Sequence, residues 1–229
     1  LTNNNVTVSG DGFANGQGAS YDVTGTITNV GTTENTFSYT LNEGTDAGNY
    51  NITTANGTLE VTPVTNEVVV TITGHTGGEK YNGSEQTVSG YDVSINNTLY
   101  KNTDFAFSGT AEVKGTNAGN YPMGLKASDF ANVNTNFTNV KFVVTDGHLD
   151  IAKKEVTLTS ASDEKVYDGN ALTNENVTVS GDGFADGEGA SYDVTGSQTT
   201  VGTSDNKFTY TLNEGTSKDN YNITKAEGK

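Results

Sequence analysis

The chain has 229 residues and a formal net charge of −16, and its 12 basic residues are all lysines. Phosphate groups bind to clusters of basic side chains, so this balance excludes nucleic acid as an expected partner, and no apolar run is long enough for membrane insertion. The absence of Cys excludes disulfides and thiolate metal sites. Only 32% of the residues are hydrophobic and 28 are Gly, which favours short strands joined by frequent turns.

Alternating apolar and polar residues predict five strands near the start of the chain, at 5–9, 20–28, 36–41, 49–54 and 58–62. Turns are predicted at Asp11-Gly12, Asn42-Glu43-Gly44 and Asn56-Gly57. Phe37 and Tyr39 share one side of their strand, and we expect that side to face the core. Glu43 recurs as Glu214, in an Asn-Glu-Gly tripeptide that is typical of a hairpin turn rather than of paired catalytic carboxylates.

Further along the chain, alternation over 67–73 predicts the next strand, with turns at Asn96-Asn97 and Asp146-Gly147. The segment 125–133 is predicted to form one or two helical turns. The remaining predicted strands are 155–159, a strand around 165–167, 176–180, 191–199, 207–212 and 220–225, with a turn at Asp168-Gly169.

An internal repeat organises these elements. Residues 1–58 match residues 172–229 at 42 of 58 positions without a gap. A further, diverged copy lies between them. Lys80-Tyr81-Asn82-Gly83 precedes Tyr167-Asp168-Gly169, with Tyr81 86 residues before Tyr167, and the segment starting at Gly115 precedes the one starting at Gly202 by 87 residues. Gly147-His148-Leu149 matches Gly57-Thr58-Leu59. The chain is therefore predicted to hold three modules of about 85 residues.

We call these modules the first copy (module A, 1–63, without its first strand or strands), the middle copy (module B, 64–152) and the third copy (module A′, 153–229, without its last strand). Both ends fall inside a module, so we expect a fragment of a longer repeat protein. The connections are short, from Pro63 to Glu67 and from Ile151 to Lys154, so neighbouring modules are expected to touch and to form an elongated, semi-rigid rod.

A set of motifs recurs with near-constant spacing. The third copy carries Lys165-Val166-Tyr167-Asp168-Gly169, then Val201-Gly202-Thr203 and Asn220-Tyr221-Asn222-Ile223, and the first copy carries Asn49-Tyr50 and the ending Gly57-Thr58-Leu59-Glu60-Val61-Thr62. In these motifs the chain resembles the YDG/MBG-type repeat modules of bacterial cell-surface adhesins. The middle copy departs from the pattern, with Tyr81-Asn82-Gly83 in place of Tyr-Asp-Gly and Asn136-Phe137 in place of Asn-Tyr. The resemblance implies a tandem β module in a wall-attached, Gram-positive adhesin or stalk.

Catalysis is not expected. The two histidines, His75 and His148, lie beside glycines in turn contexts, and no nucleophile elbow accompanies them. One metal site is considered: the Gly-rich loop after residue 181 holds Asp182, Asp186, Glu188 and Asp193, which are oxygen ligands suited to calcium. In the first copy Asn15 and Gln17 replace two of these carboxylates, so we expect no cofactor other than a weakly bound calcium ion.

Three further hypotheses concern the tyrosines and one lysine. The recurring tyrosines Tyr21, Tyr39, Tyr50, Tyr192, Tyr210 and Tyr221 could stack on sugars, although packing in the thin core is the favoured interpretation. Tyr50 and Tyr221 could instead anchor a turn through their hydroxyls, as in a tyrosine corner. A Lys-to-Asn isopeptide bond from Lys165 to Asn220 or Asn222 is a further hypothesis.

The predicted fold is all-β, with three tandem antiparallel modules. An Ig-like sandwich is the first choice, and a β-grasp-like arrangement is the alternative suggested by the helical segment 125–133. The predicted function is a non-catalytic stalk or spacer, and a host glycan- or mucin-binding module is the alternative. The expected partners are neighbouring repeats of the same chain, with host glycan or mucin as the alternative, and the expected state is a monomer. The expected location is extracellular, at the cell wall, because cysteine-free β modules of this kind point to bacterial surfaces.

Overall fold

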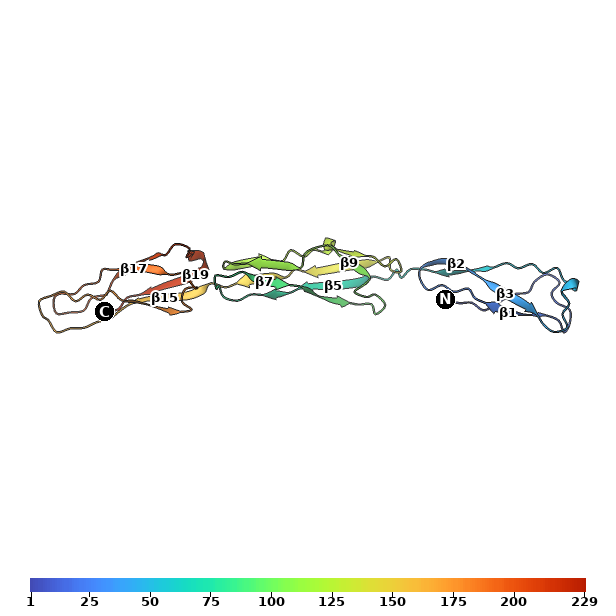
Figure 1. Cartoon of the computed structure of the whole chain (residues 1–229), viewed down its shortest axis with the longest axis horizontal. Coiled ribbons are helices and arrows are strands. Elements are labelled where there is room, and N and C mark those ends of the chain that lie inside the picture. Colours follow the sequence, from blue (N-terminus) through green and yellow to red (C-terminus); the bar gives the residue numbers. More distant parts are fainter. The chain divides into compact units, whose positions relative to one another are not determined.

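Nineteen short strands and three single 3-10 turns form the regular structure of the computed structural model, which describes residues 1–229. The strands make eight small sheets of two or three strands each, in antiparallel and mixed arrangements (Figure 1). This confirms the all-β class. None of the helical turns is long enough to cross a bilayer.

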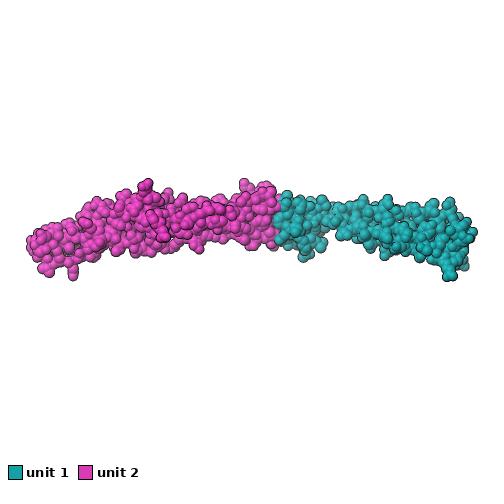
Figure 2. All heavy atoms as spheres, in the orientation of Figure 1, with its two compact units in different colours: residues 1–70, 95–106, 131–141 teal, residues 71–94, 107–130, 142–229 magenta.

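Two compact units divide the chain (Figure 2). Unit 1 comprises residues 1–70, 95–106 and 131–141, and unit 2 comprises residues 71–94, 107–130 and 142–229. The first copy belongs wholly to unit 1 and the third copy wholly to unit 2, whereas the middle copy contributes residues to both.

The first copy contains two antiparallel strand pairs. In one pair, β1 (Ala19–Val23) lies against β3 (Phe37–Leu41), with Tyr21 opposite Tyr39. In the other, β2 (Gly31–Asn35) lies against β4 (Gly57–Val61), which buries Leu59. The 3-10 turn η1 (Ala47–Asn49) is capped by the side chain of Asp46, which accepts from the backbone N–H of Gly48.

The middle copy holds ten strands. One sheet has the order β13-β5-β8, a second has the order β11-β14-β6, and two further pairs join β7 with β10 and β9 with β12. In the second sheet β14 lies antiparallel to β11 and parallel to β6. The bounds are β5 (Val68–Gly74), β6 (Thr76–Gly77), β7 (Gln86–Ser89), β8 (Tyr91–Ile95), β9 (Phe105–Phe107), β10 (Glu112–Gly115), β11 (Gly119–Pro122), η2 (Ala127–Asp129), β12 (Phe130–Asn132), β13 (Val140–Thr145) and β14 (His148–Ile151).

The third copy is built around β15 (Lys154–Ser160), whose alternation buries Val156 and Leu158. This strand lies between the antiparallel β16 (Val177–Gly181) and the parallel β19 (Tyr221–Ala226). A separate antiparallel pair joins β17 (Ala190–Val194) to β18 (Phe208–Leu212), and η3 (Lys218–Asn220) precedes β19.

Nearly identical sequence forms different strands in the first and third copies. Segments 5–9 and 49–54 were predicted as strands, but they are not, although their counterparts are β16 and β19. Both counterparts pair with β15, and the first copy contains no residues equivalent to β15. The reverse holds for β2, which was not predicted: its counterpart at 202–206 is not a strand, because the third copy has no residues equivalent to most of β4. A strand forms only where a partner satisfies its backbone groups.

Two further predictions were wrong and one was confirmed. The segment 165–167 is not a strand, and Tyr167 is 63% exposed. The helical turn predicted within 125–133 is confirmed as the single 3-10 turn η2, after which the chain extends into β12. The strand predicted at 191–199 ends at Val194, because the next two backbone N–H groups both donate to the carbonyl of Lys207 and turn the chain.

One hydrophobic cluster in unit 2 is shared by the middle and third copies. It joins Leu149 and Ile151 of β14 to Val156 and Leu158 of β15, and it also includes Tyr81, Ala185, Phe208 and Tyr221. The two copies thus share a core, and the boundary between them is packed like a protein interior.

Candidate functional site

In unit 1, the side chain of Asn136 in the middle copy forms hydrogen bonds with the first copy; we call this boundary, and the one between the middle and third copies, a junction. Asn136 accepts a hydrogen bond at Oδ1 from the backbone N–H of Val30 at 2.7 Å, and its Nδ2 donates to Oδ1 of Asn29 at 3.3 Å. The backbone carbonyl of Asn136 also accepts from the N–H of Val64 at 2.8 Å, beside a parallel bridge between Val64 and Phe137. Both ends of the Asn136 amide therefore bind the first copy, whereas its backbone carbonyl binds within the middle copy, next to the connection between the two.

In unit 2, the same contact recurs between the middle and third copies. Asn220 accepts at Oδ1 from the N–H of Ala118 at 2.8 Å, and its Nδ2 donates to Oδ1 of Asn117 at 3.1 Å. Asn220 is only 1% exposed. Asn136 and Asn220 thus make the same hydrogen bonds. Asn136 binds the Asn-x-Gly loop at residues 29–31 of the first copy, and Asn220 binds the one at residues 117–119 of the middle copy.

The glycine that ends this loop identifies the true register of the middle copy. Gly31, Gly119 and Gly202 have φ of +143°, +159° and +154°, a conformation that favours glycine. Gly119 lies opposite Ile151 as Gly31 lies opposite Val61. The alignment of Gly115 with Gly202 proposed from sequence was therefore wrong by four residues, and this error hid the Asn-x-Gly loop.

The Tyr-Asn-Gly motif of the middle copy supplies the second contact of the unit 2 junction. Tyr81 is 5% exposed and packs edge-on against Tyr221, with ring centroids 5.6 Å apart. Its hydroxyl donates to Oε1 of Glu188, and the hydroxyl of Tyr221 donates to Oε2 of the same carboxylate at 2.8 Å. The Tyr221 hydroxyl also accepts from the N–H of Ala185 at 3.0 Å. One carboxylate thus joins two tyrosines from different copies.

An ion pair lies beside the two tyrosines. Lys80 donates to both carboxylate oxygens of Asp182 at 2.7 Å, and the N–H of Glu155 donates to the same carboxylate at 2.8 Å. These bonds, led by the one from Lys80, hold the pKa of Asp182 below its usual value. The pair is partly exposed, so it orients the copies more than it stabilises them.

The tyrosine hydroxyls of this junction should make its stability sensitive to alkaline pH. Burial, helped by the neighbouring Glu188, raises the pKa of Tyr221 from 10.0 to about 12, although the bond from Ala185 opposes the shift. Burial and Glu188 raise the pKa of Tyr81 as well. A raised tyrosine pKa favours the protonated, folded form, so this stability is complete below pH 10 and is lost as the pH rises toward 12.

We therefore expect the stability of unit 2 to fall between pH 10 and about 12, and the fall to be shallower in Tyr221→Phe. The ¹³C NMR shift of the Tyr221 ring carbon that bears the hydroxyl measures the titration. A midpoint near 10, the unperturbed value, would contradict the burial of this hydroxyl between two copies.

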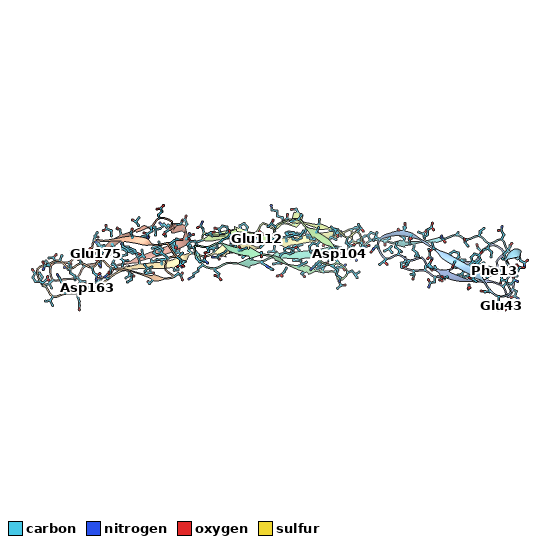
Figure 3. All side chains as sticks on the ribbon, in the orientation of Figure 1. Phe13, Glu43, Asp104, Glu112, Asp163 and Glu175 are labelled. Atoms are coloured by element: carbon cyan, nitrogen blue, oxygen red, sulfur yellow. The ribbon has the colours of Figure 1, made fainter.

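The first copy carries a similar set of side chains. Tyr50 accepts from the N–H of Ala14 at 3.1 Å and donates to Gln17, as Tyr221 does with Ala185 and Glu188. This confirms that Tyr50 and Tyr221 anchor a turn through their hydroxyls. The side-chain Nε2 of Gln17 donates to the carbonyl oxygen of Gly44 at 3.0 Å. Glu43, which precedes Gly44 in the same turn, is labelled in Figure 3 together with Phe13. Asn49, the counterpart of Asn220, is exposed and its side chain has no hydrogen-bond partner.

The four candidate calcium ligands do not converge. Asp182 pairs with Lys80 and Glu188 accepts from two tyrosines, so both carboxylates already have partners. No group of three or more His, Cys, Asp or Glu side chains is placed to hold a metal ion, so Asp186 and Asp193 do not complete a site. The difference between Glu188 in the third copy and Gln17 in the first copy has another explanation. Glu188 accepts hydrogen bonds from two tyrosine hydroxyls, whereas Gln17 accepts only one.

The acidic or amide residue of the Tyr-Asp/Asn-Gly motif closes a local turn. Asp168 accepts from the N–H of Asn170 at 2.9 Å, and Asn82 accepts from the N–H of Ser84 at 2.9 Å. An amide oxygen fills this role as well as a carboxylate does, which accounts for the Asp-to-Asn change. Lys165 also donates to Asp168 at 2.9 Å, and these bonds lower the pKa of Asp168 to about 2.

Lys165 is therefore engaged with its own loop, while Asn220 lies in the junction and Asn222 donates to Glu155. The structure does not bring Lys165 to either asparagine, so the proposed isopeptide partners were wrong.

The histidines and exposed tyrosines lie apart from the junctions. Nδ1 of His75 donates to the carbonyl oxygen of Ser89 at 2.8 Å, and its Nε2 lies 3.5 Å from Asp92 at an exposed site. Tyr21 and Tyr39 are 37% and 39% exposed, so the expectation that Tyr39 faces the core was wrong. Their counterparts Tyr192 and Tyr210 are half-buried.

No protein-family model, curated protein or solved structure matches this chain.

Proposed function

We propose that this chain is a non-catalytic stalk segment of a bacterial cell-surface adhesin, in which small β-sandwich modules are joined end to end to hold a binding region away from the cell wall. The observation that carries the proposal is the repeated junction. Asn136 with Val30 and Asn220 with Ala118 make the same two amide bonds, although the middle copy has diverged elsewhere.

A spacer requires each pair of neighbours to keep one orientation. A flexible linker cannot do this, whereas a connection of a few residues with buried, directional hydrogen bonds can. The junction of unit 2 adds a buried aromatic pair, a shared carboxylate and an ion pair. The acidic, cysteine-free composition agrees with an extracellular, wall-attached location.

The test compares the motions of the copies in solution. We expect ¹⁵N relaxation to give the middle and third copies one rotational correlation time, and small-angle scattering to give a maximum dimension on the order of 100 Å for three modules in line. In Asn220→Ala the motion of the two copies relative to each other should increase, while the core that they share keeps them joined. Asn49→Ala is the matched control, because its side chain has no partner, and it should leave the motion unchanged.

Independent motion of the copies in the unmodified chain would refute the stalk. The second candidate, a module that binds host glycan or mucin, is favoured by the exposed cross-strand pair Tyr21 and Tyr39. Glycan binding that is lost in Tyr21→Ala, with the motion of the copies unchanged, would favour that candidate instead.

A further inference from the structure

The ion pair between Lys80 and Asp182 joins two positions at which the copies differ in charge. Lys80 precedes the motif tyrosine Tyr81, and the third copy has Val166 in the same place, before Tyr167. Nζ of Lys80 lies 2.7 Å from both carboxylate oxygens of Asp182, so the ammonium group is directed at the next copy. At this position the middle copy therefore carries a cation, whereas the third copy carries an apolar side chain.

The position of Asp182 also has a counterpart in the middle copy, which is Asn96. The N–H of Asp182 donates to the carbonyl of Glu155 at 2.7 Å, and its carboxylate accepts from the N–H of Glu155 at 2.8 Å. Asn96 makes the same two bonds with Val69, at 3.2 and 2.9 Å, and the residues of each pair are 27 positions apart. The first copy has Asp11 at this position. The first and third copies thus carry an acid here, and the middle copy carries a neutral amide.

The motif lysine of the third copy has a different partner. Lys165, one position earlier than Val166, donates to Asp168 of its own loop at 2.9 Å. The middle copy has Glu79 in place of Lys165 and Asn82 in place of Asp168. The middle copy thus lacks the lysine that binds its own loop, and it has instead a lysine that binds the neighbouring copy.

The backbone around Lys80 is held in place for this contact. The side chain of Gln86 accepts from the N–H of Glu79 at 3.0 Å and donates to the carbonyl of Lys80 at 3.2 Å. The N–H of Tyr81 donates to the carbonyl of Ala152 at 2.8 Å. Because the chain is fixed on both sides of Lys80, only its side chain has to be ordered to reach the acceptor.

A charge at such a boundary selects between neighbours, because an unmatched charge costs free energy that a matched pair avoids. Lys80 opposite Asn96 would meet a neutral amide. Val166 opposite Asp182 would remove the ammonium partner of the carboxylate and leave only the nearby charge of Lys154. The two other combinations, Lys80 with Asp182 and Val166 with Asn96, leave neither charge unmatched.

We infer that these two positions specify the order of the copies. A copy with lysine at the position of Lys80 takes as its next neighbour a copy with aspartate at the position of Asp182, and not a copy with asparagine there. The partner selected by the middle copy is therefore the third copy rather than a second copy like itself. The inference rests on the stalk proposal, since the order of copies matters only where neighbours form a fixed junction.

Two substitutions in the full chain, made singly and together, reproduce all four combinations of neighbours. Lys80→Val gives the middle copy the residue of the third copy, and Asp182→Asn gives the third copy the residue of the middle copy. The new amide should keep the bond from the N–H of Glu155, because Asn96 makes this bond with Val69. The loop around position 182 should therefore fold as before.

Hydrogen exchange of the Ala118 amide measures the opening of the junction, because this N–H donates to Oδ1 of Asn220 in the third copy at 2.8 Å. We expect each single substitution to raise the exchange rate about two- to fivefold, the range for a partly exposed ion pair. The double variant should raise it less than either single substitution, because neither charge is then unmatched. Lys165→Val is the matched control and should leave the rate unchanged, since Lys165 binds its own loop.

Three results would overturn the inference: single substitutions that leave the exchange rate unchanged, a double variant whose rate rises at least as much as that of either single variant, or an equal effect of Lys165→Val. Failure of the stalk proposal is seen separately, in the ¹⁵N relaxation of the unmodified chain. Independent motion of the copies there refutes the stalk, whereas a shared correlation time together with any of the three results refutes only the selection of neighbours.

Discussion

Replacing Tyr81 by alanine is expected to lower the free energy of unfolding of unit 2 by about 3 to 5 kcal/mol, the range for deleting a buried aromatic side chain. Tyr81 is 5% exposed, packs against Tyr221 and belongs to the core that the middle and third copies share. The change also leaves one oxygen of Glu188 without its donor. Hydrogen exchange of the Leu149 and Leu158 amides, on either side of the junction, measures the loss.

Tyr167→Ala is the matched control for this prediction. Tyr167 stands in the same motif but is 63% exposed, so its removal should cost less than about 1 kcal/mol. Tyr81→Phe separates the two contributions, since it keeps the ring and removes the hydroxyl, at a cost of about 1 to 3 kcal/mol. Equal effects of Tyr81→Ala and Tyr167→Ala would mean that the motif tyrosine stabilises its own loop rather than the junction.

Gly25→Ala is expected to destabilise unit 1 by about 3 kcal/mol, because an added methyl group has no room. A Cβ atom at Gly25 would lie 2.5 Å from Cα of Asn35, against backbone that cannot move aside without breaking the pairing of β2 with β4. Asn35 is itself held in place, since its Nδ2 donates to the carbonyl of Asn3 at 2.8 Å.

Gly57→Ala is the control on the other side of the same asparagine. A Cβ atom there would lie 3.9 Å from Cβ of Asn35, an ordinary contact, so the loss should stay below about 1 kcal/mol. Urea denaturation of the two variants, followed by hydrogen exchange of the Leu59 amide, provides the comparison. If Gly25→Ala is as stable as Gly57→Ala, the close approach of the chain at Asn35 is not a constraint on the fold.

The strands that alternation predicted correctly are those whose partner lies within the same copy. β15 and β18 were found because Val156, Leu158 and Phe208 alternate with polar residues and are buried. Segment 5–9 has the same alternation as β16 but forms no strand. Alternation of apolar and polar residues indicates which face of a strand would be buried, but it does not indicate whether a partner strand is present.

The junction could be predicted only in part. The sequence motifs singled out Tyr81, Asn220 and Tyr221, but not that they meet, because the contact joins residues more than 100 positions apart. Asn29 and Asn117 were not predicted as contact residues. Both begin an Asn-x-Gly tripeptide whose glycine has a positive φ, and correct alignment of the middle copy would have revealed this shared tripeptide. Tyr167 shows the limit of the motif: its sequence is that of a buried tyrosine, but its burial depends on a neighbour.

The parallel pairing of β15 with β19 has a mechanical consequence. Their register places Lys154 opposite Tyr221 and Thr159 opposite Ala226. Tension that pulls the start of β15 away from the end of β19 would draw these strands past each other along their length. All of their evenly spaced hydrogen bonds would then bear the load together rather than break one after another, so the copy should resist a steady pull far better than a hairpin opened from its end.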